Sequence, residues 1–347
     1  MSGHSGHPGA EILIKGEPLP TEVFNSIARV TVRSRMYGSD TFTVEFDAGP
    51  NHWQDSPHFP LGGEVTIKMG QQDDLQTVHE GDLTAYFIEF LHRKGTKFVF
   101  RGHDRSHRLH RVVRFRSFQA QCDSDVIKDM VGDHGLTASV DDSPMNGEVR
   151  VQFNQTDHAF IRDRARRLGW LYRVEGNELT FKAPTFEDSG KSYSVDKEIF
   201  SFDIGLEMSP IPTKVKVWGW DPVKKEQVSH EAKPGEEWWG PVAKSAGHKL
   251  SDKAFGENVV MVSDLAIATP DEATEIAQGV FERMTEKSLQ GPVLVRGDPE
   301  LKVGNTVYLE GLGPALEGNY LMLEVTHIWT RDGMFSRLQV GRNAVDV

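Results

Sequence analysis

The sequence predicts an α+β protein that is mainly β, with two similar antiparallel β-barrels and an α+β domain inserted between them. Three observations support this fold class. Short runs of alternating apolar and polar residues fill the first and last thirds of the chain, a strand, helix and hairpin pattern fills the middle, and the outer thirds match each other at several points. We therefore assign residues 1–112 to the first barrel, 113–200 to the inserted domain and 201–347 to the second barrel.

The first barrel is expected to begin after a flexible arm. Residues 1–9 are mostly Gly, Ser, His and Pro, which leaves this segment little apolar surface to bury. Beyond it, apolar residues alternate in short runs separated by Gly, Pro and Asp, a pattern typical of antiparallel strands joined by tight turns. The clearest runs lie at 27–32, 42–46, 65–69, 86–90 and 98–100.

The inserted domain is organised around residues 151–182. A short strand precedes a helix that Thr156 or Asp157 can cap. The helix carries one apolar stripe, made of Phe160, Ile161, Ala165 and Leu168. Gly169 ends this helix, and a hairpin follows around residues 175–177, where Gly and Asn tolerate a tight turn. A shorter helix before it is expected to be capped by Asp123 or Ser124.

A basic segment, residues 92–116, joins the first barrel to the inserted domain. His103 and His107 have the spacing of a helical zinc pair, but the segment lacks the acidic residue of a protease motif and no third ligand is evident. We predict that this segment pairs with carboxylates of the same chain or faces an acidic partner. Nucleic acid is the minor alternative for this strip.

The second barrel also alternates, and it carries two additions. Trp218 and Trp220 share one face of a strand that ends in a turn at Asp221, and residues 231–256 form a polar surface insertion. A capping box at Thr269 predicts an amphipathic helix over about 270–289 with one buried face. Its solvated face is expected to carry Glu275, Gln278, Glu282 and Glu286.

An internal duplication is predicted from four matches in the same order. Residues 63–70 parallel 304–311, and residues 80–83 parallel 317–320. Each pair leads into a strand, a turn at 94–95 or 332–333, and a second strand that ends at Gly102 or Gly341. The approach to the repeat also matches, because residues 28–32 parallel 213–217. Two copies of one small barrel explain all four matches.

Composition excludes several classes of protein. The net charge of −12 disfavours a general nucleic-acid binder, whose affinity depends on cations that neutralise phosphates. Cys122 is the only cysteine, so an internal disulfide and a multi-thiolate metal site are excluded. The sequence contains no apolar run long enough for a membrane span and no Sec-type signal at its start, so we expect neither membrane insertion nor Sec export.

Several short motifs together resemble the phage late control protein D family. The motif residues are Gln152, Asn154, Asp157, Phe160, Arg164, Ala165 and Gly169 in the middle of the chain, Gly219, Trp220 and Asp221 further on, and Arg342 and Asn343 near its end. This family contains the tail hubs of contractile phages, the hub portion of type VI secretion spike proteins, and the hubs of extracellular contractile injection systems. The resemblance spans essentially the whole chain, and it implies barrels similar to the tail-tube subunit.

The resemblance implies a structural role. Hubs of this family are homotrimers that join a sixfold inner tube to a threefold spike, and two similar barrels in each chain give a trimer six similar units around its axis. The expected partners are therefore further copies of the chain, the inner tube or a tube-initiator protein, a spike protein, and baseplate wedge proteins. Cargo in or below the hub is a further possibility. Because the chain stops at Val347, where type VI spike proteins continue, we expect the spike to be a separate subunit.

The family also implies a place of action, namely assembly in the producer cytoplasm followed by incorporation into a virion or secreted contractile particle. We expect no enzyme activity and no cofactor, because the sequence contains no phosphate-binding loop, nucleophile elbow or recognisable acid pair. The alternative is a carbohydrate-binding module for host attachment. It rests on the aromatic pairs Trp218 with Trp220 and Trp238 with Trp239.

Overall fold

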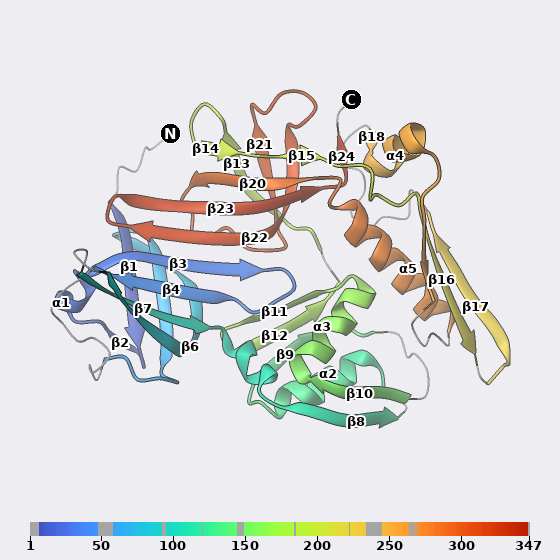
Figure 1. Cartoon of the computed structure of the whole chain (residues 1–347), viewed down its shortest axis with the longest axis horizontal. Coiled ribbons are helices and arrows are strands. Elements are labelled where there is room, and N and C mark those ends of the chain that lie inside the picture. Colours follow the sequence, from blue (N-terminus) through green and yellow to red (C-terminus); the bar gives the residue numbers. More distant parts are fainter. Residues whose placement is uncertain are drawn as a thin grey trace.

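The computed structural model describes residues 7–47, 58–91, 95–119, 121–143, 149–183, 185–221, 223–233, 245–263, 267 and 269–345. Most of the predicted arm, and both Trp238 and Trp239, lie outside this range. The protein is mainly β, as predicted, and most of its strands belong to one 14-stranded sheet. Figure 1 shows this sheet above and to the left of a smaller α+β layer, with a long helix and a separate small sheet at the right.

The first third of the chain forms one half of the large sheet. Its elements are β1 (Pro8–Ile14), β2 (Glu17–Pro18), α1 (Thr21–Phe24), β3 (Ile27–Arg35), β4 (Thr41–Phe46), β5 (Glu64–Gln71), β6 (Asp74–Leu91) and β7 (Gly95–His103). Alternate residues of these strands point into one core, which includes Val32, Val44, Ile67 and Phe100. This alternation is the period of two that the sequence showed.

The middle of the chain forms the α+β layer. Its elements are η2 (Arg105–His110), β8 (Val113–Gln119), α2 (Asp123–Gly132), β9 (Thr137–Val140), β10 (Val149–Thr156), α3 (Asp157–Leu168), β11 (Leu171–Glu175) and β12 (Glu178–Lys182). All four residues of the predicted stripe on α3 are buried. Thr156 caps this helix by accepting a hydrogen bond from the amide of Ala159, and Gly169 ends it at a φ of 68°. The predicted hairpin is present, with Glu175 paired to Glu178.

The predicted cap of α2 is wrong, because Cys122 occupies the N-cap position and forms no side-chain capping bond. Asp123 lies inside the first turn instead. Its carboxylate is engaged by the guanidinium of Arg150, with Nε and Oδ1 2.6 Å apart. The Asp123 side chain, which the sequence pattern assigned to the helix cap, therefore forms a buried ion pair instead.

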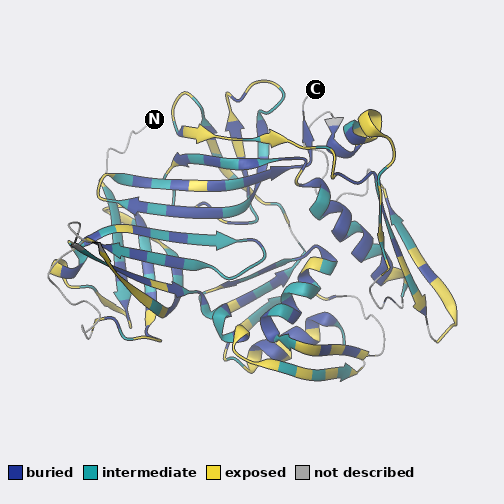
Figure 2. Cartoon of the chain, in the orientation of Figure 1, coloured by how far each residue is buried: buried dark blue, intermediate teal, exposed yellow. Residues whose placement is uncertain are grey.

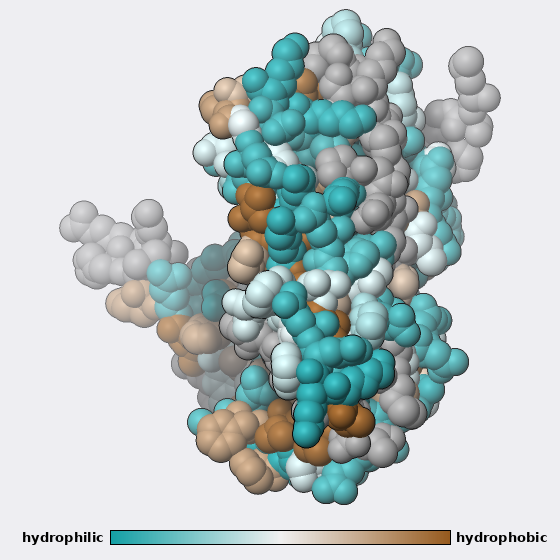
Figure 3. Space-filling model, turned by 90° about the vertical axis from the view of Figure 1, so that its right-hand side faces the viewer, coloured by the Kyte–Doolittle hydropathy of each residue, from teal (hydrophilic) through white to brown (hydrophobic). Residues whose placement is uncertain are grey.

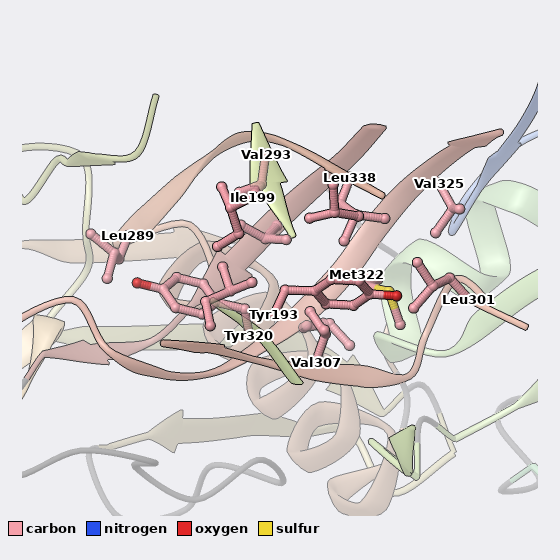
Figure 4. Close-up of a cluster of buried hydrophobic side chains, with 14 of the residues drawn as sticks. Tyr193, Ile199, Leu289, Val293, Leu301, Val307, Tyr320, Met322, Val325 and Leu338 are labelled. Atoms are coloured by element: carbon pink, nitrogen blue, oxygen red, sulfur yellow. The ribbon is translucent and has the colours of Figure 1, made fainter. Parts of the chain in front are cut away.

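The last third completes the large sheet and adds an insertion to it. The sheet strands are β13 (Asp188–Ser194), β14 (Ile199–Phe202), β15 (Gly205–Leu206), β20 (Leu289–Arg296), β21 (Thr306–Glu310), β22 (Gly318–Thr330) and β23 (Gly333–Arg342). They enclose a second core, and Figure 4 shows Tyr193, Val307 and Tyr320 packed together inside it. The insertion, between β15 and β20, contains β16 (Lys214–Asp221), β17 (Glu226–Ala232), β18 (Ser245–Ala246), α4 (Gly247–Phe255), β19 (Val259–Val262) and α5 (Pro270–Thr285). A short final strand, β24 (Ala344–Val345), pairs with β18.

The two halves of the large sheet have the same strand order. Neighbours run β3, β4, β7, β6, β5 in the first half and β14, β20, β23, β22, β21 in the second, and each set follows the same order along the chain. Both long strands, β6 and β22, also carry a register shift, between Leu83 and Ala85 and between Met322 and Glu324. We call these two sets the first and second repeat units. The shared pairing supports the predicted duplication, whereas closure of either unit into a barrel stays a prediction.

Two of the four sequence matches need correction. The match of residues 80–83 is offset by two, because the register shifts align Leu83 with Met322 and not with Tyr320. The match of residues 28–32 falls on a strand of another sheet. Residues 213–217 lie at the start of β16, which pairs with β17 and β19 in a separate three-stranded sheet. The strand that occupies the position of β3 in the second repeat unit is β14, because β3 pairs with β4 as β14 pairs with β20. The sequence pattern misled us because β16 has strong alternation, while β14 contains only four residues.

Helix α5 is shorter than predicted and less exposed. It spans Pro270–Thr285, and Thr269 caps it as expected, but the chain enters β20 at Leu289. Glu282 and Glu286, predicted to be solvated, are buried. One face of α5 packs on the core under β16 and β17, and α3 covers another face, where Gly279 lies against Leu168. A polar face of α5 is therefore covered by the middle domain. The local periodicity of the sequence does not reveal this contact.

Candidate assembly surfaces

The ribbon of β8 and β10 presents an apolar face to solvent. These two strands form a sheet by themselves, and alternate residues on each strand point outward. The outer face is apolar and consists of Val113, Phe115, Val149, Val151 and Phe153, of which Phe153 is 67% exposed. Figure 2 shows the alternation of exposure along the ribbon, and Figure 3 shows apolar side chains gathered at this lower end of the molecule. A clustered, exposed apolar surface of this kind is typical of a contact site for another protein.

The inner face of the ribbon is held by a buried polar network centred on Asp157. Its carboxylate accepts hydrogen bonds from Gln152 Nε2 at 2.8 Å, from His134 Nε2 at 2.8 Å and from the guanidinium of Arg116. Gln152 also accepts a bond from Arg116 Nε at 2.9 Å. Burial alone would raise the pKa of Asp157, but these hydrogen bonds and the charge of Arg116 hold the pKa below its usual value. The carboxylate is therefore charged and fixes the ribbon on the start of α3.

A second buried ion pair secures the other strand end. Arg150 and Asp123 are both almost fully buried, and Arg164 Nε lies 3.7 Å from the same Asp123 oxygen. The Arg164 guanidinium also lies over the ring of Phe160, 5.1 Å from its centroid. Two motif residues of α3 thus support the underside of β10.

The remaining motif residues of the middle domain have backbone or packing roles. Asn154 has a φ of 50°, and the ladder between β10 and β8 shifts register at this point. Asn tolerates this left-handed conformation better than most residues, so it allows the bulge before α3. Ala165 is fully buried in the core, and Gly169 forms the left-handed end of α3. The structure therefore places five of the seven middle-domain motif residues in or beneath the ribbon, whereas Ala165 lies in the domain core and Gly169 at the far end of α3.

The other motif residues lie elsewhere. Gly219 lies in β16, where a Cβ atom would meet the carbonyl oxygen of Ile267 at 2.2 Å. Asp221 ends the strand by accepting bonds from the amides of Val223 and Lys224, and Trp220 is 57% exposed. At the end of β23 the side chain of Arg342 is buried, and Nη1 donates to the carbonyl of Glu317 at 2.9 Å.

Asn343 lies next to Arg342, and its carbonyl accepts a bond from the amide of Gly247 at 2.8 Å. These roles are structural. The residues of the buried networks that motif reasoning missed are Arg114, Arg116, His134, Arg150 and Asp123. A signal for Arg114 and Arg116 was present in the alternation of Arg with apolar residues along 113–118, which places these two cations on one face of a strand.

Two strand edges also expose apolar side chains. The end of β6 exposes Tyr86, Phe87, Ile88 and Phe90, and β14 with β15 exposes Phe200, Phe202 and Leu206. Among the described strands, residues 85–91 of β6 pair only with β7, and β14 pairs only with β20. Within the described part of the chain, each edge therefore has a row of unpaired backbone donors and acceptors as well as apolar side chains.

The basic segment pairs largely with carboxylates of this chain, as predicted. Asp82 accepts bonds from His107 at 2.7 Å and from Arg108 at 2.8 Å, and Arg105 pairs with Glu64. His107 is thus engaged by a carboxylate of this chain, and no group of three or more His, Cys, Asp and Glu within the described ranges has the arrangement of a metal site. None of the described helices is both long and apolar enough to cross a membrane.

Comparison with known proteins identifies the fold. A protein family described as Alg8 N-terminal domain matches residues 10–330. A 43 kDa tail protein of prophage MuSo2 from Shewanella oneidensis is similar in structure, with a TM-score of 0.72 and 12% identity over 98% of this chain and 100% of that one. A tail protein from Neisseria meningitidis MC58 is similar with a TM-score of 0.69 and 10% identity, over 97% of each chain.

A third similar structure is the E. coli c3393 protein, described as a type VI secretion component that resembles the bacteriophage T4 tail proteins gp27 and gp5. Its TM-score is 0.62 at 11% identity, over 96% of this chain and 76% of that one. No curated protein sequence matches this chain. At these identities the likeness establishes the fold, and it confirms the tail-hub resemblance predicted from the sequence motifs.

Proposed function

The chain belongs to the Alg8 N-terminal domain family, and from this membership and its fold we propose that it is a structural baseplate hub of a contractile tail or injection particle. In this role three copies join the sixfold inner tube to the threefold central spike. The observation that supports the proposal best is the duplicated sheet, because two equivalent units in one chain are what a threefold assembly needs to match a sixfold ring.

The contact between the two repeat units supplies a template for the contact between copies. Within the chain, Arg29–Arg35 of β3 pair antiparallel with Glu324–Thr330 of β22. The register shifts place Glu324 at the position of Ala85, so the equivalent stretch of the first repeat unit is residues 85–91 of β6. This stretch is the free edge described above. The strand equivalent to β3 is β14, whose outer edge is free as well.

We infer that β14 of one copy pairs with β6 of the next, in the manner of β3 on β22. Each copy then uses β14 to pair with one neighbour and β6 to pair with the other, which is a head-to-tail contact. If each contact rotates the next copy by one third of a circle, three copies close a ring of six repeat units. Formation of the ladder would satisfy the free backbone groups and bury the exposed side chains of Phe90 and Phe200.

The apolar ribbon of β8 and β10 projects from the middle domain, outside this predicted ring contact. We propose that it contacts another baseplate component, either a wedge protein, the spike or the tube protein. Its buried ionic underside supports this role, because the Asp157 and Asp123 networks hold the apolar side chains in one orientation before any partner binds. The chain is proposed to assemble in the producer cytoplasm and to act without catalysis or a cofactor.

The hub proposal is tested by electron-microscope averaging and mass measurement of the purified chain, alone and with its spike subunit. A threefold ring with a central channel and six lobes is expected. Phe90→Asp and Phe200→Asp place a charge on each edge and are expected to give monomers. Phe255→Asp is a matched control, because Phe255 is as exposed as Phe90, at 71%, but lies at the end of α4. A monomeric wild-type chain under both conditions would remove the adaptor proposal.

One observation favours the carbohydrate-binding alternative. Trp218 and Trp220 are 51% and 57% exposed on the same face of β16, so their rings are available for stacking on a sugar. A glycan array and a murein pull-down separate the two functions. Binding that is lost in Trp218→Ala and retained in Phe90→Asp would favour attachment over assembly as the role of this surface.

A further inference from the structure

A hollow lined by histidine and arginine side chains lies where the first repeat unit meets the middle domain. It has a volume of about 510 Å³, and its walls come from the turn between β3 and β4, from the segment around η2, and from α3. The ionisable side chains along these walls, apart from Tyr37, are Arg35, Arg162, His103, His107, His110 and His158. No Asp or Glu is among the described residues that line it. We call this hollow the histidine pocket.

The hydrogen bonds of the histidines leave part of each ring available. His158 Nδ1 is bonded to the hydroxyl of Tyr172 at 2.7 Å, and His103 Nδ1 is bonded to Thr84 Oγ1 at 3.0 Å. His110 Nε2 lies 3.2 Å from Ser39 Oγ, and its ring stacks on that of His158 with the centroids 3.6 Å apart. Each of these rings is held in position by one nitrogen, and its other nitrogen forms no hydrogen bond with a residue in the described part of the chain.

Arg162 is the unbalanced charge of the histidine pocket. Within the described part of the chain its guanidinium forms no hydrogen bond and no ion pair, although it lines the pocket from α3. The neighbouring cations differ in this respect. His107 shares Asp82 with Arg108, and Arg35 lies 3.3 Å from Glu324, which also pairs with Arg33.

Burial is the main cause that lowers the pKa of three rings in the pocket, and neighbouring charges add to it. Burial lowers the pKa of His158 to about 3, with further lowering by His110 and Arg162. Burial also lowers the pKa of His110, again assisted by Arg162, and the pKa of His103 is lowered by burial and by His107. An anion bound here would oppose this mutual repulsion, because it adds the charge that the walls lack.

We propose that the histidine pocket binds a small molecule through a phosphate group. A tetrahedral oxyanion can accept hydrogen bonds from donors that converge from several directions, and the guanidinium fork of Arg162 suits it geometrically. The hydroxyl group of Thr41 adds a neutral donor to the same walls. The volume exceeds what inorganic phosphate requires, so an organic group fits beside the phosphate and the stacked His110 and His158 rings.

Such a ligand would brace two parts of the fold. The walls belong to the first repeat unit and to the middle domain, and the backbone at Tyr37 bridges to Tyr172 of β11 beside the pocket. Binding to the folded state alone stabilises that state by mass action. A phosphate ligand is therefore expected to raise the unfolding temperature of the chain and to fix the angle of the apolar ribbon relative to the large sheet.

The test uses calorimetric titration of the full chain with pyrophosphate and with inorganic phosphate at constant ionic strength, and sodium chloride as the reference. Saturable binding is expected for pyrophosphate. Arg162→Gln should weaken it at least about ten-fold, because a charge-assisted contact is lost. Arg166→Gln is the matched control, since Arg166 is an exposed arginine one turn along α3, and it should bind as the wild type does.

A second variant guards against an effect of Arg162→Gln on folding. His110→Gln removes one stacked ring and keeps a polar side chain, and it too should weaken binding while the thermal midpoint without ligand stays near that of the wild type. Equal binding by all variants would overturn the proposal, as would no saturable binding by any phosphate. Binding of a single-stranded oligonucleotide without any binding of pyrophosphate would also overturn it, in favour of a nucleic-acid contact.

Discussion

The two long strands β6 and β22 occupy equivalent places in the two repeat units, yet they differ in exposure. Trp329 in β22 is 6% exposed, whereas Phe90, which the shared register shift places at the same position in β6, is 71% exposed. The reason is coverage, because β3 pairs along Glu324–Thr330 and no described strand pairs along the equivalent edge of β6. The same element is thus a core strand in one unit and an open edge in the other.

This difference indicates where the chain is incomplete by itself. An exposed strand edge with aromatic side chains is a liability for a soluble monomer, and proteins normally cover or charge such edges. The covered strand shows how the fold solves the problem once inside the chain. We expect a strand of a second copy to cover the open edge of β6 in the same way.

The largest effect is expected from removing the two equivalent aromatic side chains. Trp329→Ala should lower the free energy of unfolding by about 3–5 kcal/mol, since a large buried side chain leaves a cavity. Phe90→Ala should change it by less than about 0.5 kcal/mol in the monomer. Urea denaturation followed by circular dichroism measures both. Similar losses for the two variants would show that the strands are equally covered, and the comparison would fail.

Two glycines near the ends of equivalent strands, Gly102 in β7 and Gly341 in β23, give a smaller contrast. A Cβ at Gly102 would lie 2.2 Å from the ring of Phe42 and 2.3 Å from the carbonyl oxygen of Asp82, whereas at Gly341 the nearest atoms are the Glu286 carbonyl oxygen at 2.8 Å and Leu323 at 3.0 Å. Gly102→Ala is therefore expected to destabilise by about 2–3 kcal/mol and Gly341→Ala by about 1 kcal/mol. Thermal melting of both variants tests this order. A reversed order would mean that the first repeat unit yields more easily than its packing indicates.

A charge exchange sharpens the assembly inference. Phe90→Lys and Phe200→Glu alone should each weaken self-association more than about ten-fold, because a charge would be buried without a partner. The double variant should recover part of that loss, since opposite charges would then face each other between copies. Sedimentation equilibrium measures the association. A double variant no better than either single variant would indicate that β6 and β14 do not meet.

A pH-dependent effect concerns the covered end of β23. Glu286 lies beside Gly341, and burial raises the pKa of its carboxyl group to about 8. The folded state thus holds this proton more tightly than the unfolded state, whose pKa is near 4.5. The contribution to stability is fully present below pH 4.5 and is lost as pH rises toward 8, at a rate of at most about 1.4 kcal/mol per pH unit.

Glu286→Gln removes the titrating group and should flatten this slope. Urea midpoints of the wild type and the variant at pH 5 and pH 8 are the measurement, with the difference between the two proteins isolating Glu286 from other groups. The variant should gain relative to the wild type at pH 8 and change little at pH 5. An unchanged slope would show that Glu286 is accessible to water in the folded chain.

Local patterns were predicted well because their causes are local. The cap at Thr156, the stripe on α3, the left-handed Gly169 and the hairpin after it depend on residues within a few positions of each other, and all were found. The strands that repeat, β5 to β7 and β21 to β23, also showed themselves through spacing of Gly and apolar residues. The strand β14 was missed as a repeat element, because four residues carry too little periodicity to outweigh β16.

The motif residues that support the ribbon of β8 and β10 could be predicted from the sequence, but their interaction partners could not. The motif residues Gln152, Asp157 and Arg164 were named from the sequence, yet their partners Arg116, His134 and Asp123 lie between 23 and 41 positions away in the chain. Distances of that kind are set by the packing of α2, α3 and the ribbon. No local pattern distinguishes an arginine that pairs inside from one that meets solvent.

The amino-acid sequence by itself determined the fold class, the tail-hub resemblance and the existence of a duplication, because alternation, capping and turn chemistry act over short stretches of chain. Tertiary structure alone decided which faces are covered. It buried Glu282 and Glu286 between α5 and its neighbours, left Phe90 exposed while covering Trp329, and gathered four histidines and Arg162 around one hollow. These outcomes depend on contacts between segments far apart in the chain, where the same residue pattern can meet protein or water.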